Sequence, residues 1–471
     1  MKKPCLKKAG ILPFIAVMLF FASCINGYHD DWELTSDVKG VTLESPDAAK
    51  VTFSKNTENV LTIQWGVVYG AIGYELSVID ITDVNNPVNI IDKKVVDGCF
   101  DRCTVAEDTN YKIVLRALGN PKYDNKDAVA STEVPYSTMI PAIVIPNGTD
   151  LYEWFAANPI TQSDEEQAYE LEAGGSYSVS GELNFGDNWI ILRGNKADRP
   201  TLTYGLDGRL VASAKGFSLK FINLDLSAIP ANANSAVILL DAASTGTIPN
   251  PIVLQSCNIN GVEGRILYNN GKTYTVSDFL IKDCVIEWLS TNRPAIDVQQ
   301  GFVDHLTISN STIYGLRNSE NYFIRYQNGQ RGSASFVKFA NSTFYNICKG
   351  GQMANYSGMS VKTFTLTLDQ NIFFDCGNQN VVRRLCVSSN NPVKIIKNNC
   401  YWFNGAFPQA GEIDQSNGES SVTATNNAAN VLERGFGEEP GFANPATGDF
   451  TVAASATEIL RLHVGDPRWL P

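Results

Sequence analysis

A short phrase of apolar and small polar residues recurs along the last two thirds of this 471-residue chain, at intervals of 27 to 33 residues. Repeats with a period of roughly 20 to 50 residues indicate an architecture built from stacked units. Each unit here consists of short β-branched or aromatic runs separated by turn residues, and no helical period is present. We predict that the repeated apolar anchors stack inside a coil of parallel strands, with one turn of the coil per repeat. The anchors are Leu226, Ile259, Ile286, Ile313, Phe344, Phe373 and Trp402.

A small polar residue lies three positions before each anchor. Short polar side chains satisfy backbone groups at tight corners, and equivalent side chains in successive turns can form a ladder. The predicted fold class is therefore all-β: a right-handed parallel β-helix preceded by a small β-sandwich. The polar residues are Asn223, Ser256, Asp283, Asn310, Asn341, Gln370 and Asn399.

The first residues are typical of an exported protein. Four lysines among the first eight residues precede an apolar run from Ile11 to Phe21, which is too short to span a bilayer as a helix. Together with the small residues before Cys24, this start resembles a bacterial lipoprotein signal, which implies cleavage after residue 23 and lipidation of Cys24 in the outer membrane. The alternative is an ordinary secretion signal. Asp30 and Asp31 resemble the surface-export signal of Bacteroidetes lipoproteins.

The charge of the chain excludes some partners. The net charge is −12, and removal of residues 1–23 would leave 33 basic against 49 acidic residues, a net charge of −16. An acidic surface argues against nucleic acid and against electrostatic attachment to anionic lipid. An anionic ligand would therefore need a local basic patch or a bridging cation.

The cysteines and histidines indicate no metal site. Cys257 and Cys284 occupy equivalent repeat positions, where a spacing of roughly 4.8 Å is wider than the roughly 3.8 Å between the Cβ atoms of a disulfide. We expect a reduced, packed pair. Cys99 and Cys103 could form a disulfide in an oxidising compartment, and this stays open. No cofactor is expected except that Ca²⁺ is possible, and zinc is not expected.

Residues 24–40 are predicted to be a tether, and residues 41–139 to form the β-sandwich. Alternating apolar and polar residues in 60–65, 73–80 and 110–118 indicate half-buried antiparallel strands. With Trp65 and Tyr111 this region resembles a fibronectin type III domain. The resemblance implies that Trp65 lies in the core, that the Tyr111 hydroxyl bonds the backbone nearby, and that the domain is a spacer.

Residues 140–407 are predicted to be the β-helix with an N-terminal cap, and residues 408–471 a capping tail. A short amphipathic helix is expected in 150–159, with Trp154 and Trp189 packed in the cap. The segment IILRGN followed by RPTL resembles the entry of pectate-lyase-like β-helices. The whole region from 140 resembles lipoproteins of unknown activity found beside polysaccharide-degrading enzymes in gut Bacteroidetes, which implies glycan-utilisation proteins as possible partners.

One candidate site is a polar column on the strand before each phrase. Aligning segments 265–271, 295–301 and 323–329 on their glycines turns Ile266, Ile296 and Ile324 inward. The next residues, Leu267, Asp297 and Arg325, then point outward on one face, with rungs about 5 Å apart. The column is expected to continue through Asn355 and then Arg383 or Arg384, with Gln299 and Gln327 beside it.

Arginine and aspartate in this arrangement suit an acidic sugar. Arg binds a uronate carboxylate through two hydrogen bonds, and Asp could help to hold Ca²⁺. The resemblance to β-helix polysaccharide lyases would offer Arg325 or Arg383 as the base, although an arginine is a poor base. The alternative is that Asp297 and Arg325 form a surface ion pair worth less than about 1 kcal/mol.

Aromatic residues of the repeats that face outward could stack on sugar rings. Trp402 is expected in the core, whereas Trp288 and above all Tyr345 could face outward. The sequence leaves three functions open: a cell-surface binder of an extended acidic, pectin-like polysaccharide, an active polysaccharide lyase, or an adhesin or scaffold with no glycan site.

Overall fold

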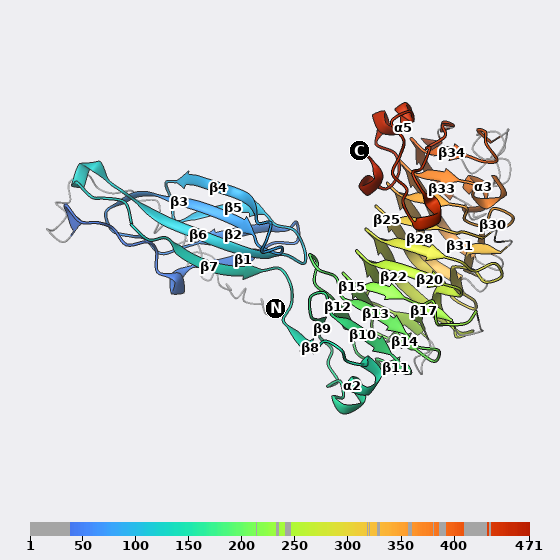
Figure 1. Cartoon of the computed structure of the whole chain (residues 1–471). Coiled ribbons are helices and arrows are strands. Elements are labelled where there is room, and N and C mark those ends of the chain that lie inside the picture. Colours follow the sequence, from blue (N-terminus) through green and yellow to red (C-terminus); the bar gives the residue numbers. More distant parts are fainter. Residues whose placement is uncertain are drawn as a thin grey trace, which may run out of the picture. The chain divides into compact units, whose positions relative to one another are not determined.

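The computed structural model describes residues 38–212, 214–231, 235–240, 246–317, 319, 321–326, 330–356, 360–379, 381–385, 392–408, 431–432 and 435–471. The chain separates into two compact units, one ending at Met139 and the other beginning at Ile140 (Figure 1). We refer to them as the N-terminal unit and the β-helix unit. In the described part of the chain, no helix is long and apolar enough to cross a membrane.

The N-terminal unit consists of two antiparallel sheets that share one core. Trp65 and Tyr111 are buried in this core, as predicted. The Tyr111 hydroxyl accepts a hydrogen bond from the Ala106 backbone N–H at 2.7 Å, which is the predicted bond to the nearby backbone. Cys99 and Cys103 do not form a disulfide with each other. One sheet contains β1 (Thr52–Lys55), β2 (Val60–Gln64) and β5 (Phe100–Thr104), and the other β4 (Val88–Val96), β3 (Ala71–Asp80), β6 (Asn110–Gly119) and β7 (Thr132–Ser137).

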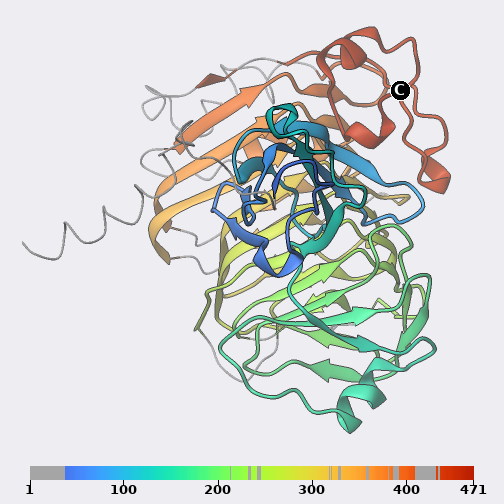
Figure 2. The ribbon, with the colours of Figure 1, turned by 90° about the vertical axis from the view of Figure 1, so that its left-hand side faces the viewer.

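The β-helix unit is a right-handed parallel β-helix with three sheets, in which each strand pairs in parallel with its equivalent in the next coil (Figure 2). Sheet I has 12 strands: β8 (Ala142–Ile145), β9 (Gln167–Leu171), β12 (Ile190–Arg193), β15 (Phe217–Lys220), β18 (Gly246–Ile248), β19 (Ile252–Gln255), β22 (Tyr274–Lys282), β25 (Phe302–Ser309), β28 (Gln330–Ala340), β31 (Ser360–Asp369), β33 (Pro392–Lys397) and β35 (Val431–Leu432). Sheet II has 9 strands: β10 (Ser176–Val179), β13 (Thr201–Tyr204), β16 (Asn223–Asp225), β20 (Asn258–Val262), β23 (Val285–Trp288), β26 (Thr312–Tyr314), β29 (Thr343–Tyr345), β32 (Ile372–Phe374) and β34 (Cys400–Trp402). Sheet III has 7 strands: β11 (Glu182–Asn184), β14 (Arg209–Val211), β17 (Ala236–Leu239), β21 (Arg265–Tyr268), β24 (Ile296–Val298), β27 (Tyr322–Tyr326) and β30 (Gln352–Asn355).

The predicted file of anchors lies inside sheet II. The paired and buried residues are Leu224, Ile259, Ile286, Ile313, Phe344, Phe373 and Tyr401. Five of the predicted anchors are confirmed, and the first and last were wrong. Leu224 replaces Leu226, and Tyr401 replaces Trp402, which instead pairs with Phe374 on the outer side of the sheet.

A tight corner joins sheet I to sheet II in each coil. The corner residue has φ between +47° and +58°, a left-handed conformation that Asn, Asp and other short polar residues tolerate best. The prediction is confirmed at Ser256, Asp283, Asn310, Asn341 and Gln370, but Phe221 and Asn398 hold the corner in the first and last copies. Each corner residue lies three positions before the true anchor, so both errors follow from the misplaced anchors.

A polar ladder runs through the interior one residue after the corners. Side-chain oxygens of Ser311, Ser342, Asn371 and Asn399 accept backbone N–H groups of the preceding coil at 3.0 to 3.3 Å. A ladder was predicted, but at the corner residue itself. The same interior position holds Cys257 and Cys284, which are buried and free as predicted.

The first coil is covered by a helix, and the tail of the chain packs against one side of the coil. The helix α2 (Leu151–Ala157) caps the first coil, with Leu151 and Phe155 buried and Trp154 packed edge-on against Tyr169, as predicted. At the other end, η6 (Pro445–Thr447), α5 (Thr457–Leu462) and η7 (Pro467–Trp469) belong to the tail. Residues 436–464 of the tail pack on the outer side of sheet II.

Both aromatic residues that were candidates for stacking on sugars pack against other parts of the protein. Tyr345 does face outward, but Phe442 and Phe450 of the tail cover it. Trp288 is buried, and its indole N–H donates to the Gly264 carbonyl oxygen at 3.0 Å. The prediction that Trp288 could face outward was wrong, whereas the outward position of Tyr345 is confirmed and its stacking on a sugar stays a prediction.

Candidate functional site

A β-bulge in strand β21 of sheet III determines which of its side chains face outward. The backbone N–H groups of Ile266 and Leu267 both donate to the Ala295 carbonyl oxygen, at 2.7 and 3.1 Å, so two residues of β21 oppose one residue of the next coil. Leu267 is consequently buried inside and pairs with Ile296, while Tyr268 pairs with Asp297. The prediction that Leu267 points outward was wrong because alignment on the glycines cannot reveal this bulge.

The outer column of sheet III contains the other predicted residues in register. Asp297 pairs with Arg325, and Arg325 pairs with Asn355, as the predicted column requires. In order along the coil, the column is Asn184, Val211, Leu239, Tyr268, Asp297, Arg325 and Asn355.

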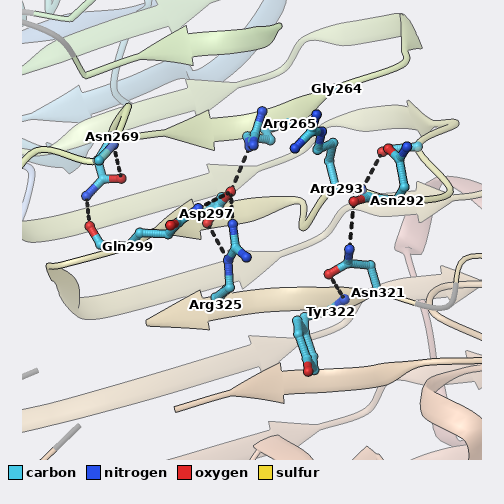
Figure 3. A network of polar contacts seen from close by, with 12 residues as sticks. Gly264, Arg265, Asn269, Asn292, Arg293, Asp297, Gln299, Asn321, Tyr322 and Arg325 are labelled. Atoms are coloured by element: carbon cyan, nitrogen blue, oxygen red, sulfur yellow. Dashed lines mark hydrogen bonds and ion pairs between the residues drawn. The ribbon is translucent and has the colours of Figure 1, made fainter. Parts of the chain in front are cut away.

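Asp297 lies at the centre of a polar cluster formed by two arginines (Figure 3). Arg325 donates from Nε to Asp297 Oδ1 at 2.7 Å and from Nη2 to Oδ2 at 2.6 Å, which is the paired geometry of a guanidinium on a carboxylate. Arg265 donates from Nε to the same Oδ2 at 2.7 Å. We call Arg265, Asp297 and Arg325 the arginine cluster.

The cluster is buried and opens to solvent at one end. The side chain of Asp297 is 0% exposed and that of Arg265 is 2% exposed, whereas Arg325 retains 19%. The sequence-based alternative of an ion pair between Asp297 and Arg325 is confirmed, but its surface position was wrong because Asp297 is fully covered. Asp297 cannot hold Ca²⁺ in this arrangement, since both carboxylate oxygens already accept guanidinium hydrogen bonds.

Arg265 is the residue that sequence reasoning missed. Its guanidinium carbon lies 3.7 Å above the ring centre of Tyr268, a cation–π contact made by two residues on either side of the bulge. Burial lowers the pKa of the Arg265 guanidinium, and Asp297 opposes that shift. An arginine at the start of a strand could have been noticed in the sequence. The alignment on the glycines, however, selected Ile266 and the residue after it, and so left Arg265 out of the predicted column.

Among the described residues, the two guanidinium groups of the cluster meet at a single carboxylate. One carboxylate serves two guanidinium groups, and the positive charge of Arg293 adds to the lowering of the Arg265 pKa. Arg293 Nε is buried and bonds nothing among the described residues. Arg325 Nη1 makes no hydrogen bond within the described part of the chain, so its N–H groups are open to an anion at the exposed end.

The remaining predicted residues lie around the cluster or outside it. Gln299 Nε2 lies 3.5 Å from Asp297 Oδ2, at the outer limit of a hydrogen bond, and Asn355 is one coil further on. Arg384 lies on α3 (Val381–Leu385), where a strand was expected, and its Nε is buried with no hydrogen-bond partner among the described residues. Gln327, the side chain of Arg383 and the lipidation residue Cys24 fall outside the described residues.

The column does not form a continuous open groove. Val211, Leu239 and Tyr268 are 0%, 1% and 8% exposed, so among the described residues the column is accessible only at its two ends, at Asn184 and at Arg325 with Asn355. Among the described residues, no group of three or more His, Cys, Asp or Glu side chains could hold a metal ion. The arrangement can therefore bind an anionic group at one point rather than along the whole sheet.

The fold and this cluster define a right-handed parallel β-helix protein with a partly buried arginine site. Three sequence families, each described as a domain of unknown function, match successive parts of the chain: DUF4992 at residues 5–174, DUF4957 at 175–316 and DUF5123 at 337–469. The first match runs past the boundary at Met139 into the first coil of the β-helix. No curated protein matches the sequence.

Solved structures of several polysaccharide-acting enzymes are distantly similar. A mutant of the PL6 family alginate lyase AlyGC is 12% identical with a TM-score of 0.33, over 69% of this chain and 45% of that chain, so this protein spans less than half of the lyase. Pectate lyase PelI from Erwinia chrysanthemi in complex with tetragalacturonic acid is 10% identical with a TM-score of 0.17, over 84% of this chain and 100% of that one. A Family 28 exopolygalacturonase from Yersinia enterocolitica is 11% identical with a TM-score of 0.17, over 77% and 80%. At these values we infer nothing about chemistry from the similarity.

Proposed function

We propose that this protein is a lipid-anchored cell-surface protein that binds an extended acidic, pectin-like polysaccharide through the open end of the arginine cluster. The observation that carries the proposal is the partial exposure of Arg325: it shares the Asp297 carboxylate with Arg265 and is the member of the cluster that reaches solvent. In a chain with a net charge of −12, such a point is where a uronate carboxylate would be held.

Pre-organisation supports binding at Arg325. The two hydrogen bonds to Asp297 fix the guanidinium plane, so little side-chain entropy is lost when a ligand carboxylate meets the remaining N–H groups. Ca²⁺ could still bridge two uronates of the ligand itself, and this stays a prediction.

Binding is favoured over a lyase activity by the state of the arginines. A lyase needs a base that is free to reach the substrate, but the Arg325 guanidinium is engaged by both oxygens of the Asp297 carboxylate. Burial lowers the pKa of Arg265, yet its side chain is only 2% exposed, so a sugar cannot reach it. Neither arginine is therefore suited to remove a proton.

The rest of the chain suits a displayed binder. We infer that Cys24 carries the lipid, that the protein is exported to the surface in the manner of Bacteroidetes lipoproteins, and that it works beside other glycan-utilisation proteins. The N-terminal unit would act as a fibronectin type III-like spacer; its two antiparallel sheets and the Tyr111 bond to Ala106 support this proposal.

The proposal is tested by electrophoresis of the full chain through gels containing polygalacturonate, alginate or chondroitin sulfate, with and without Ca²⁺. Arg325→Ala should weaken retention by roughly tenfold to a hundredfold, because a charge-assisted hydrogen-bonded pair contributes about 1.5–3 kcal/mol. Arg116→Ala is the matched control, since Arg116 also bridges two strands in a salt bridge, to Glu75, but lies in the N-terminal unit.

Two further readings separate the alternatives. Arg325→Lys keeps the charge without the paired geometry, and it should retain part of the binding even if the alanine variant is poorly folded. A rise in the ultraviolet absorbance of unsaturated uronates would show a lyase instead. The proposal would be contradicted if no acidic glycan retained the protein, or if Arg325→Ala were retained as strongly as the unmodified chain. The remaining function would then be that of an adhesin or scaffold with no glycan site.

A further inference from the structure

A pocket of about 400 Å³ lies at the N-terminal end of the β-helix unit, between α2, the segment that follows it, and β11. Its volume falls within the range of roughly 300–1,000 Å³ that is usual for small-ligand sites. Apolar side chains form much of the lining, including Phe155, Ile160 and Phe185. From the sequence, only a capping role was predicted for this region.

One wall of the pocket is an aromatic ring. Tyr152 on α2 is 45% exposed, although its neighbours Leu151 and Phe155 are buried in the cap. The ring lies against Gly181: a Cβ added to Gly181 would come within 3.1 Å of both Cγ and Cδ1 of Tyr152. Because Gly181 has no side chain, the Tyr152 ring can lie across the backbone at this point. The exposed part of the ring borders the pocket.

Polar groups face the same space from the first strand of sheet III. Along β11, Leu183 points inward, while Glu182 and Asn184 are exposed on the outer side and line the pocket. Asn184 Oδ1 accepts the Gly186 N–H at 2.9 Å, and neither its Nδ2 nor the Glu182 carboxylate has a partner in the described part of the chain. β11 is also the terminal strand of its sheet and pairs only with β14, so one backbone edge faces the cap.

These groups match the chemistry of a sugar ring without charge. An aromatic face suits the apolar face of a pyranose, while a carboxylate and an amide accept from and donate to its hydroxyl groups. A uronate is disfavoured because Glu182 is negative and the nearby Arg209 guanidinium donates to the carbonyl oxygens of Leu206 and Gly208.

We infer that this pocket is a binding site for an uncharged sugar residue, separate from the arginine cluster. Along sheet III, Asn184 of the pocket lies five coils from Arg325, or about 24 Å at strand spacing, and three coils from the strand of Arg265. Buried Val211 and Leu239 lie between them, so the outer column of sheet III is covered between the two places. The inference holds whether or not the cluster binds uronates.

The test is saturation-transfer NMR on the full chain with xylotetraose, galactotetraose and mannotetraose, and with tetragalacturonate for comparison. We expect transfer to at least one uncharged tetrasaccharide, with a dissociation constant raised at least tenfold by Tyr152→Ala. Gly181→Ala should raise it as well, because the added methyl group displaces the ring. Tyr69→Ala is the control, since Tyr69 is 76% exposed in the N-terminal unit and should leave binding unchanged.

Near-ultraviolet circular dichroism checks that each variant keeps its native packing. The inference is overturned if none of the three uncharged sugars receives transfer from the unmodified chain, or if Tyr152→Ala binds them equally well. Transfer to tetragalacturonate that disappears in Tyr152→Ala would also overturn it, since the pocket would then be the acidic site. Loss of uronate binding with intact binding of an uncharged sugar would refute only the function proposed for the cluster.

Discussion

Replacing Asp297 by Asn tests how the arginine cluster is held. The carboxylate is 0% exposed and accepts three short hydrogen bonds, from Arg265 at 2.7 Å and from Arg325 at 2.7 and 2.6 Å. Asn can accept at one oxygen only, and its NH₂ group would face a guanidinium. Because the substitution removes the buried carboxylate that both arginines share, we expect a loss of about 3–5 kcal/mol in the free energy of unfolding.

Hydrogen exchange read by mass spectrometry is suited to a chain of two units, because it locates the loss. A loss of about 3–5 kcal/mol corresponds to exchange roughly a hundred to several thousand times faster in β21, β24 and β27. The control is Asp101→Asn, which breaks a pair with Lys94 that is 52% exposed, and it should cost less than about 1 kcal/mol. A similarly small loss for Asp297→Asn would refute the reasoning that the cluster is a buried unit.

Two other substitutions test the ends of the protein. Burial raises the pKa of Asp466 to about 6, so the tail that holds it is most stable when the carboxyl is protonated. Its unfolded pKa is about 3.9, and stability worth roughly 3 kcal/mol should therefore be present below that pH and be lost as pH rises through about 6. Asp466→Asn should abolish this dependence in urea unfolding followed from pH 4 to 8, and an unchanged pH slope would contradict the assignment. Cys24→Ala should abolish incorporation of labelled fatty acid and release the protein from the membrane fraction; retention there with the label intact would exclude Cys24 as the anchor.

The repeated phrase was sufficient to predict the β-helix and most of its interior. The period placed Ile259, Ile286, Ile313 and Phe344 in one file, because the left-handed corner fixes the register of the strand that follows it. The first copy misled because Phe221, an unusual residue for this conformation, holds the corner there. The last copy offers two adjacent asparagines, and Asn398 rather than Asn399 takes the corner.

The site was predictable in register but not in burial. Asp297 and Arg325 pair across coils as predicted, since β24 and β27 pair without a register shift and the glycine spacing is preserved. The spacing does not reveal that the outer column is covered, nor that Arg265 stacks on Tyr268. Val381 and Val382 suggested another strand, but these residues lie in α3, a tertiary outcome that overrides their local preference.

The most direct test of the proposed function is the hydrogen-exchange footprint of a uronate ligand on the unmodified full chain. With saturating tetragalacturonate, exchange should slow in β27 and β30, which carry Arg325 and Asn355, and stay unchanged in β12 and β15. A footprint that leaves β27 and β30 unaltered, or one that appears only elsewhere, would contradict the assignment of acidic-glycan binding to this end of the cluster.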